Sequence, residues 1–402
     1  MFSYPLLLLS LASTITAKSL LEAISPYPEL SNFTAFYSAN SIFANALFGN
    51  ESLYPITVLI PNNNAFAAYQ AKTGKSLTDV SPETLLPLIQ YHTLATSLSA
   101  ENLTTDSNSG TGSTIPSLLN DPIYNNRTAG PSLVAKYGGS QRASGQVVFI
   151  SPAGSSSASK RFVLSSRQDG GSTTSTIRSG LQSTVNLTLV DFSSSTWTGG
   201  HFHIIDNLLT PPDLCATTIR GAGLSSLDNA LNRTKLWPAL DGTANLTCLG
   251  PSNEAFKSAG SADSTLGEQE LTNALLFHTL PQVAYSDFLE DGMVMKTLGN
   301  GTVRVKVEGK GASRQIWFNN AKVVDANVLT HNGLMHVLDS VMKPLEELNA
   351  TASASPSSTS KPTATVSSSA SGAAKSTGAA VRGVTYDGWG LAGVLGAVLA
   401  MV

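Results

Sequence analysis

The sequence is poor in charge and in aromatic residues, and both scarcities argue against particular kinds of partner. Charged residues make up 13% of the 402 positions and the formal net charge is −3, so the chain offers no basic field to a nucleic-acid backbone. We therefore expect no nucleic-acid partner. Aromatic residues make up 7% and lie mostly within strand or helix patterns, so they form no obvious platform for a sugar or lipid ligand.

Sequence signatures of catalysis are missing as well. The chain contains no Gly-x-Ser-x-Gly elbow, and Gly299-x-Gly301 lacks the rest of a dinucleotide fingerprint. The many serines lie in low-complexity segments rather than beside a candidate base. We therefore expect a protein that is not an enzyme and that has no cofactor.

Cysteine occurs only twice, as Cys215 and Cys248. In an oxidising compartment these two are the obvious pair, and we predict a disulfide between them. In the chain-entropy model, closing a loop of this length stabilises a domain by about 3–4 kcal/mol. Two buried free thiols are the alternative.

Both ends of the chain indicate processing or tethering. Residues 1–17 combine an apolar stretch with small residues, the layout of a secretory signal peptide, although Lys and Arg are missing from its start. Residues 349–380 are rich in Ser and Thr, which predicts an O-glycosylated stalk, with an unglycosylated flexible linker as the alternative. Residues 381–402 form a spacer and an apolar segment that is too short to cross a bilayer comfortably as a helix.

This C-terminal layout matches a glycosylphosphatidylinositol (GPI) attachment signal, which is cleaved and replaced by lipid. Small residues precede the spacer, and Ser376 and Gly378 are the attachment candidates. A retained tail anchor, or a segment that is merely apolar, is the alternative. The predicted membrane contact is therefore a lipid anchor.

Asn-x-Ser/Thr sequons are frequent and spread over the chain, which predicts a glycan-coated surface because only exposed sites are modified. The candidate sites are Asn32, Asn50, Asn102, Asn126, Asn186, Asn232, Asn245, Asn300 and Asn349.

The rest of the chain repeats one pattern twice, which predicts two copies of one domain. Three motifs recur in the same order: residues 57–66 (TVLIPNNNAF), 91–94 (YHTL) and 203–206 (HIID), then 246–256 (LTCLGPSNEAF), 277–280 (FHTL) and 336–339 (HVLD).

A Pro-Pro pair at Pro211 and Pro212 is the natural boundary between the copies. We assign residues 18–212 to the first domain and 213–348 to the second. The first copy has more residues between its last two motifs, in Ser/Gly-rich pieces within residues 96–200. We expect this insertion to form surface loops, since closure entropy grows slowly with loop length.

The repeated motifs also predict local structure. Each first motif predicts a strand, a tight turn and the start of a helix, because an apolar run leads into Pro followed by Asn or Ser, which are good turn and N-cap residues. A helix follows in each copy, and Pro87 must kink or restart the first one. In the second copy, residues 302–307 alternate as a strand, residues 315–318 and 322–324 flank an Asn-Asn hairpin turn, and residues 334–341 form a final strand.

Four of the histidines, His92, His203, His278 and His336, belong to the repeated motifs. Metal binding and base catalysis need partner ligands or carboxylates, which the motifs do not supply. We therefore predict buried histidines that are hydrogen-bonded within the core. His201-x-His203 places two imidazoles on one strand face, without a visible third metal ligand.

These motifs resemble those of the fasciclin domain family of secreted adhesion and matrix proteins. The first motif and the YHTL and FHTL motifs match in both copies, and residues 332–339 (NGLMHVLD), followed by Lys343-Pro344, match the family's second box. The resemblance covers about residues 19–212 and 213–344. The first copy departs from the pattern, because Gly199-Gly200-His201 replaces the usual Asn-Gly approach to the last box.

The resemblance implies an α+β fold in which each domain is a β-sandwich wedge of about seven strands with packed helices. It also implies contacts with extracellular matrix, cell-wall or cell-surface proteins or glycans. Some members recognise integrins through an Asp-Ile pair, where this chain has Asn327 and Val328. The missing carboxylate, together with Phe277 in place of the motif tyrosine, disfavours integrin-type recognition.

Three functional hypotheses follow. The first is a GPI-anchored adhesion or cell-wall interaction protein at the plasma membrane. The second is a vacuolar or secretory-pathway membrane factor whose lumenal domains assist membrane fusion or sorting, and a simply secreted protein is a variant of the first. The third is a carbohydrate- or lipid-binding module.

Overall fold

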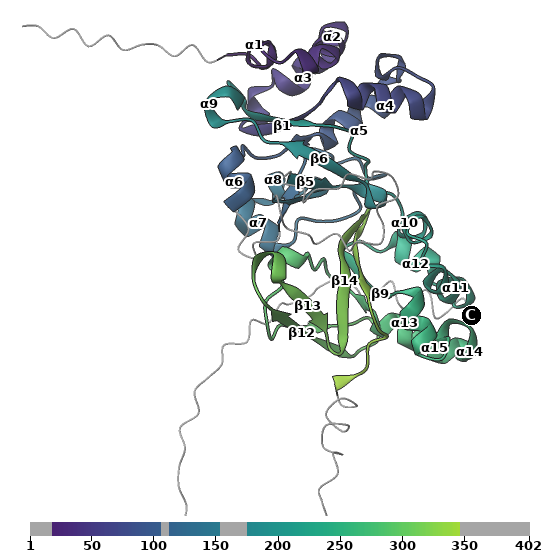
Figure 1. Ribbon diagram of the computed structural model, residues 1–402. Coiled ribbons are helices and arrows are strands. Elements are labelled where there is room, and N and C mark those ends of the chain that lie inside the picture. Colours follow the sequence, from purple (N-terminus) through teal and green to yellow (C-terminus); the bar gives the residue numbers. More distant parts are fainter. Residues whose placement is uncertain (1–17, 106–111, 153–174, 346–402) are drawn as a thin grey trace, which may run out of the picture. The chain divides into compact units, whose positions relative to one another are not determined.

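The computed structural model describes residues 18–105, 112–152 and 175–345 (Figure 1). The predicted signal peptide, the stalk, the anchor signal, the attachment candidates Ser376 and Gly378 and the sequon at Asn349 lie outside these ranges. None of the helices in the described ranges combines the length and the apolar character that crossing a membrane requires.

Two sheets follow each other along the chain. The first contains β1 (Ile56–Pro61), β2 (Thr93–Leu94), β3 (Ser113–Pro116), β4 (Val147–Ser151), β5 (Ser175–Arg178), β6 (Thr184–Thr188), β7 (Thr196–Trp197) and β8 (Gly200–Ile205). The second contains β9 (Leu246–Pro251), β10 (Thr279–Leu280), β11 (Val294–Lys296), β12 (Thr302–Glu308), β13 (Gln315–Phe318), β14 (Ala321–Thr330) and β15 (Gly333–Leu338).

Helices accompany each sheet (Figure 1). Those of the first domain are α1 (Leu20–Ile24), α2 (Ser31–Ala39), α3 (Ser41–Phe48), α4 (Asn63–Thr73), α5 (Pro82–Tyr91), α6 (Ala100–Thr105), α7 (Pro131–Tyr137), α8 (Ser140–Ala143) and α9 (Phe192–Ser195). Those of the second are α10 (Cys215–Gly221), α11 (Ser225–Arg233), α12 (Trp237–Gly242), α13 (Asn253–Ser258), α14 (Ala262–Thr265) and α15 (Glu268–Phe277).

The two sheets have the same strand order. The first runs β2-β1-β8-β6-β5-β4-β3, with β7 added to β8, and the second runs β10-β9-β15-β14-β13-β12-β11. In each, one long parallel pair, β1 with β8 or β9 with β15, joins the start of the domain to its end. The α+β class and the seven-stranded pattern expected from the sequence are confirmed.

The parallel pair explains a glycine in each domain. Gly200 lies opposite Ile56, and Gly333 lies opposite Leu246 in the same register. A Cβ atom would lie 2.0 Å from the Ile56 carbonyl oxygen at Gly200 and 1.9 Å from the Leu246 carbonyl oxygen at Gly333. Gly200 therefore takes the place of Gly333, so the departure seen in the sequence of the first copy does not extend to this glycine.

The predicted strand-turn-helix motifs are confirmed. Pro61 ends β1, and the side chain of Asn62 accepts a hydrogen bond from the Ala65 N–H to cap α4. In the second domain, Ser252 caps α13 in the same way through the Ala255 N–H. These caps satisfy N–H groups that the first helical turn leaves unpaired.

The other predicted elements of the second domain are also present as β12, β13, β14 and β15. Asn319 occupies the turn between β13 and β14 with a φ of 54°, a conformation that Asn tolerates better than most residues. In the first domain, α5 begins at Pro82 and continues through Pro87 to Tyr91 as one helix, so of the two outcomes predicted for Pro87, a kink or a restart, the restart does not occur.

The Ser/Gly-rich pieces predicted to form surface loops lie mostly outside the described ranges, whereas residues 117–146, which connect β3 to β4, contain α7 and α8. The equivalent connection in the second domain, between β11 and β12, is only residues 297–301. Leu133 and Tyr137 of α7 and Ala143 of α8 are buried in an apolar cluster that also contains Leu329 and Leu334 of the second domain. Apolar side chains of this connection therefore pack against a distant part of the chain.

Candidate functional site at the domain junction

The motif histidines form two equivalent pairs. His92 follows α5, and its Nδ1 lies 2.7 Å from the Leu88 carbonyl oxygen while its Nε2 accepts the Leu209 N–H at 3.0 Å. His278 follows α15 and makes the same contacts with the Ala274 carbonyl, at 2.8 Å, and the Met342 N–H, at 2.9 Å. Because Nε2 accepts, the single proton of the neutral ring is on Nδ1.

The second pair uses the opposite tautomer. His203 in β8 accepts the Val190 N–H on Nδ1 at 3.1 Å, and its Nε2 lies 2.9 Å from the Leu98 carbonyl oxygen. His336 in β15 accepts the Asn327 N–H on Nδ1 at 3.3 Å, and its Nε2 lies 2.8 Å from the Ala284 carbonyl oxygen. In this pair the proton is therefore on Nε2.

All four rings are neutral links between backbone segments. Burial lowers their pKa from 6.5 to about 4, because desolvation disfavours the charged form. Both ring nitrogens of each histidine are occupied, so neither is open to a metal ion or a substrate. The same holds for His203 in the His201-x-His203 pair, and the Nδ1 of His201 lies 3.1 Å from the Ser195 hydroxyl.

The two cysteines are free thiols in the structure, so the disulfide predicted between Cys215 and Cys248 is not found. Cys215 begins α10, Cys248 lies in β9, and both are buried in one apolar cluster. Burial raises the pKa of Cys248 to about 12 and that of Cys215 well above its ordinary value. Both thiols are therefore held in the protonated, unreactive form.

Six of the predicted sequons are exposed, and two are half-buried. The exposed sites are Asn32, Asn50, Asn102, Asn186, Asn232 and Asn300. The half-buried sites are Asn126 and Asn245, which come from different domains and lie at the junction between them: the Asn126 side chain donates to the Gly242 carbonyl, and the Asn245 side chain accepts the Thr128 N–H at 2.8 Å.

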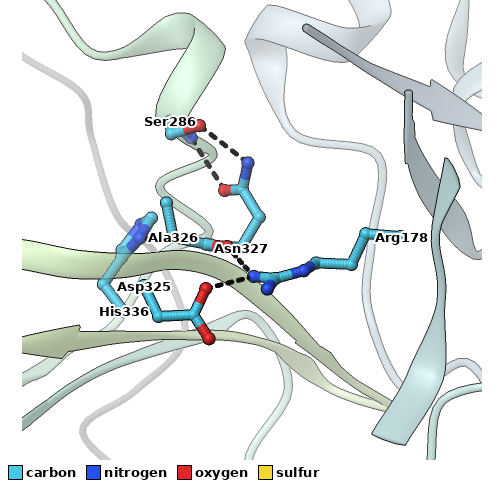
Figure 2. A network of polar contacts seen from close by, with 6 residues as sticks. All are labelled: Arg178, Ser286, Asp325, Ala326, Asn327 and His336. Carbon is cyan, nitrogen blue, oxygen red and sulfur yellow. Dashed lines mark hydrogen bonds and ion pairs between the residues drawn. The ribbon is translucent and has the colours of Figure 1, made fainter. Parts of the chain in front are cut away.

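Figure 2 shows an ion pair at this junction. Arg178 in β5 extends from the first domain, and its guanidinium donates to Asp325 Oδ1 at 2.6 Å and to the Ala326 carbonyl in β14. The Arg178 and Asp325 side chains are only 16% and 12% exposed. The pairing of β14 with β15 shifts register on both sides of Asp325, and such a bulge redirects side chains and carbonyls out of the ladder.

Asn327 stabilises the same bulge from inside the second domain (Figure 2). Its side chain accepts the Ser286 N–H at 2.9 Å and donates to the Ser286 hydroxyl at 2.7 Å. The residue is fully buried, with a φ of 54°. The position that the resemblance associates with integrin recognition is therefore a structural amide that no external partner can reach.

Residues 117–146 make the polar contacts of the junction. Gln146 is fully buried, and its side-chain amide donates to the carbonyls of Tyr124, Thr330 and His331. The Asn126 N–H donates to the His331 carbonyl at 2.7 Å. One buried amide thus links a loop of the first domain to the turn before β15.

A half-buried carboxylate adds a further link. Asp287 of the second domain accepts the Thr114 N–H at 2.8 Å and the Thr114 hydroxyl at 2.6 Å. Desolvation raises the pKa of Asp287, whereas the hydrogen bonds from Thr114 and the charge of Lys136 act in the opposite direction. Lys136 also lies 5.7 Å from the centre of the Phe288 ring, so its ammonium faces the second domain at this point.

Apolar packing makes the junction continuous with the first domain's core. Tyr285 of the second domain is buried in the same cluster as Tyr91. The Tyr91 hydroxyl donates to the Val147 carbonyl at 2.9 Å, and burial raises the pKa of both tyrosines. The second domain has Phe277 at the position equivalent to Tyr91.

Sequence reasoning did not find the junction residues Arg178, Asp325, Gln146 and Asp287. Arg178 and Asp325 are 147 positions apart, and Thr114 and Asp287 are 173 apart, so local patterns contain no sign of either pair. Residues of the predicted motifs instead hold each domain together internally.

Comparison with known proteins identifies both domains. A model of the fasciclin domain matches residues 28–146 and 222–344. A fasciclin-like arabinogalactan protein of Arthroderma benhamiae is 25% identical over 363 residues, which cover 89% of this chain and 73% of the relative. A fasciclin-like arabinogalactan protein of Cercospora beticola is 25% identical over 189 residues, which are 47% of this chain and 49% of the relative. A solved FAS1 domain pair from the insect cell adhesion molecule fasciclin I covers 79% of this chain at 14% identity, with a TM-score of 0.34.

Proposed function

The chain belongs to the fasciclin domain family, and from that premise we propose that it is a non-enzymatic adhesion or cell-wall interaction protein of the cell surface. Its relatives include proteins named as fasciclin-like arabinogalactan proteins, which supports a role among surface glycoproteins. The partners we propose are matrix, cell-wall or cell-surface proteins or glycans. Because Asn327 is buried, integrins that read a carboxylate at this position are not among them.

The observation that carries this proposal is the internal use of the family's motif residues. All four motif histidines are neutral and bonded on both nitrogens to backbone groups. Within the described ranges, no three His, Cys, Asp or Glu side chains gather into a possible metal site. What the domains offer to a partner is therefore their outer surface, on which six of the sequons are exposed.

We further propose that a GPI anchor tethers the protein to the plasma membrane. The support is the sequence layout alone, with Ser376 and Gly378 as attachment candidates and a secretory signal at residues 1–17. Treating intact cells with a phosphatidylinositol-specific phospholipase should release the protein into the medium, and heat-inactivated phospholipase is the control. Retention on the cells after treatment would contradict the tether.

Adhesion itself is tested by deletion. Cells lacking the protein should adhere less to matrix or to each other, and re-expression should restore adhesion. A tag placed just after Lys18 should outline the cell; a vacuolar rim would instead favour the fusion or sorting role. Unchanged adhesion and wall integrity in the deletion strain would overturn the adhesion proposal.

A further inference from the structure

The outer face of the second sheet carries a concentration of positive charge. Along β11, β12 and β13, side chains alternate between the core and solvent, and on the neighbouring β14 Lys322 is half-buried and Val324 is exposed. The outward strand positions include four cations and one carboxylate, namely Lys296, Arg304, Lys306, Lys322 and Glu308. A second carboxylate, exposed Asp339, lies opposite Lys322 and accepts its N–H at 2.9 Å. This face is therefore basic, although the chain as a whole is slightly acidic.

A cation-aromatic row crosses the centre of this face. Lys306 pairs across the ladder with Trp317, and Trp317 pairs with Lys322 on the next strand. The ammonium groups lie 5.2 Å and 5.6 Å from the centre of the Trp317 ring, within the range of cation–π attraction. The indole between them holds two flexible lysines on strands about 10 Å apart, which is two strand spacings.

The equivalent row of the first domain has a different chemistry. The ladder pairs Ser151 with Thr176 and Thr176 with Asn186. Asn186 is equivalent to Lys322, because each exchanges backbone contacts with the aspartate that follows the last strand, Asp206 or Asp339. The row is thus neutral and bears a sequon in one domain, and is basic and aromatic in the other.

We propose that the row of Lys306, Trp317 and Lys322 binds an anionic polysaccharide, one bearing carboxylate, sulfate or phosphate groups. This inference rests on the proposed extracellular role and names the ligand class for it. Lysine ammonium groups bind such anions as point charges, and a positive surface raises the local concentration of a polyanion. The ion pair of Lys306 with Glu308 is more than half exposed on both sides, so it holds Lys306 weakly and an incoming anion can displace it.

The geometry favours a polysaccharide over an acidic protein segment or a lipid surface. β12, β13 and β14 are hydrogen-bonded on both sides, so a peptide cannot add to them as a further strand. Trp317 is half-buried between the two lysines, and the large apolar side chains that are exposed on the face are Val294 and Val324, whereas membrane-binding faces expose Trp, Phe or Leu. An extended polyanion needs only the charges and the flat face.

The test measures binding of the full-length protein, solubilised from cells and captured through a tag after Lys18, to four soluble polymers. These are dextran sulfate, polygalacturonate, neutral dextran and poly-L-glutamate. Dextran sulfate, polygalacturonate or both should bind, and the stronger of the two identifies the anionic group. Binding should weaken as salt is raised, because exposed charges are screened. Neutral dextran should not bind, and equal binding of poly-L-glutamate would overturn the polysaccharide assignment in favour of an acidic protein partner.

Variants locate the site. Lys306→Gln/Lys322→Gln should weaken binding roughly five- to tenfold, since two of the contacting charges are lost. Lys235→Gln/Lys257→Gln removes the same charge from exposed positions of the same domain and should leave binding unchanged. Trp317→Phe keeps a ring between the lysines and should have a smaller effect than the double lysine variant. Equal binding of the two double variants would overturn the proposal. Because the polymers are tested in solution, this result is independent of the phospholipase and adhesion experiments.

Discussion

The two domains share one backbone plan and differ in what they present outward. Strand order, the register of the parallel pair, the close-packed glycine and the two histidine tautomers are the same in both. The outward row is Ser151, Thr176 and Asn186 in the first domain and Lys306, Trp317 and Lys322 in the second. Duplication has therefore kept the internal links and left the solvent face free to diverge.

The second difference between the domains lies in one connection. Residues 117–146 of the first domain reach the second, whereas the equivalent residues 297–301 form a short turn. Gln146 and Asn126 in this connection bond to the turn before β15. The longer connection of the first domain therefore links the two copies of the fold.

Acidification should have the largest effect on folding stability, and it should destabilise both domains alike. The four histidines have a pKa of about 4 when folded and about 6.5 when unfolded. The unfolded chain therefore binds more protons, and stability that is complete above pH 6.5 falls as the pH drops towards 4, by at most about 3 kcal/mol per histidine. Hydrogen exchange measured across this pH range should show both domains opening together. If only one domain opened at acidic pH, the histidines of the two domains would not be equivalent.

Replacing the close-packed glycine of either domain by alanine should have the next largest effect on stability. Gly200→Ala and Gly333→Ala each place a methyl group against a backbone carbonyl, and we expect each to cost at least about 3 kcal/mol. Gly74→Ala, at a helix end where nothing lies within 4 Å of the added Cβ, is the control and incurs only the strain of a left-handed φ of 71°, about 1 kcal/mol. Urea denaturation measures all three, and a tolerated Gly200→Ala would show that the first domain has lost the constraint.

Breaking the charged contact of the junction should cost less. Arg178→Gln leaves Asp325 largely buried without its cation, and we expect a loss of about 2 kcal/mol. Arg220→Gln removes an arginine whose side chain is 53% exposed and should change stability by less than about 0.5 kcal/mol. Equal losses in the two variants, measured by urea denaturation, would show that the junction contact contributes nothing.

The smallest expected effect concerns the half-buried sequon of the junction. Asn126→Ala removes the side-chain bond to the Gly242 carbonyl and should cost about 1 kcal/mol. Asn32→Ala, at an exposed sequon, should be close to neutral. Both variants are compared in unglycosylated protein so that sugar does not contribute. If Asn126→Ala left the stability unchanged, the Asn126 side chain would not stabilise the junction.

The sequence predicted the parts of the fold that depend on local chemistry. Asn62 and Ser252 identified the strand-turn-helix units because capping residues act within three positions of themselves. The alternating valines of β12 identified a half-buried strand in the same way. The burial of the four histidines was also predicted, because their motifs supply neither the partner ligands nor the carboxylates that metal binding or base catalysis needs.

The junction could not be predicted, because its bonds join residues far apart in the chain. Arg178 and Gln146 bond largely to backbone carbonyls, which every residue carries, so no side-chain pattern marks the partners. Cys215 and Cys248 show the opposite failure. Their chemistry suggested a bond, yet in the structure both are buried free thiols.

We expect the contacts of the domain junction, made by residues 117–146 and by Arg178, to make the two copies one cooperative unit. Calorimetric unfolding of the protein tests this directly, because a single two-state transition requires the calorimetric and van't Hoff enthalpies to agree. We expect one transition in the unmodified protein and two resolved transitions in an Arg178→Gln/Gln146→Ala variant. Two independent transitions in the unmodified protein, with midpoints that these substitutions do not move, would contradict the account.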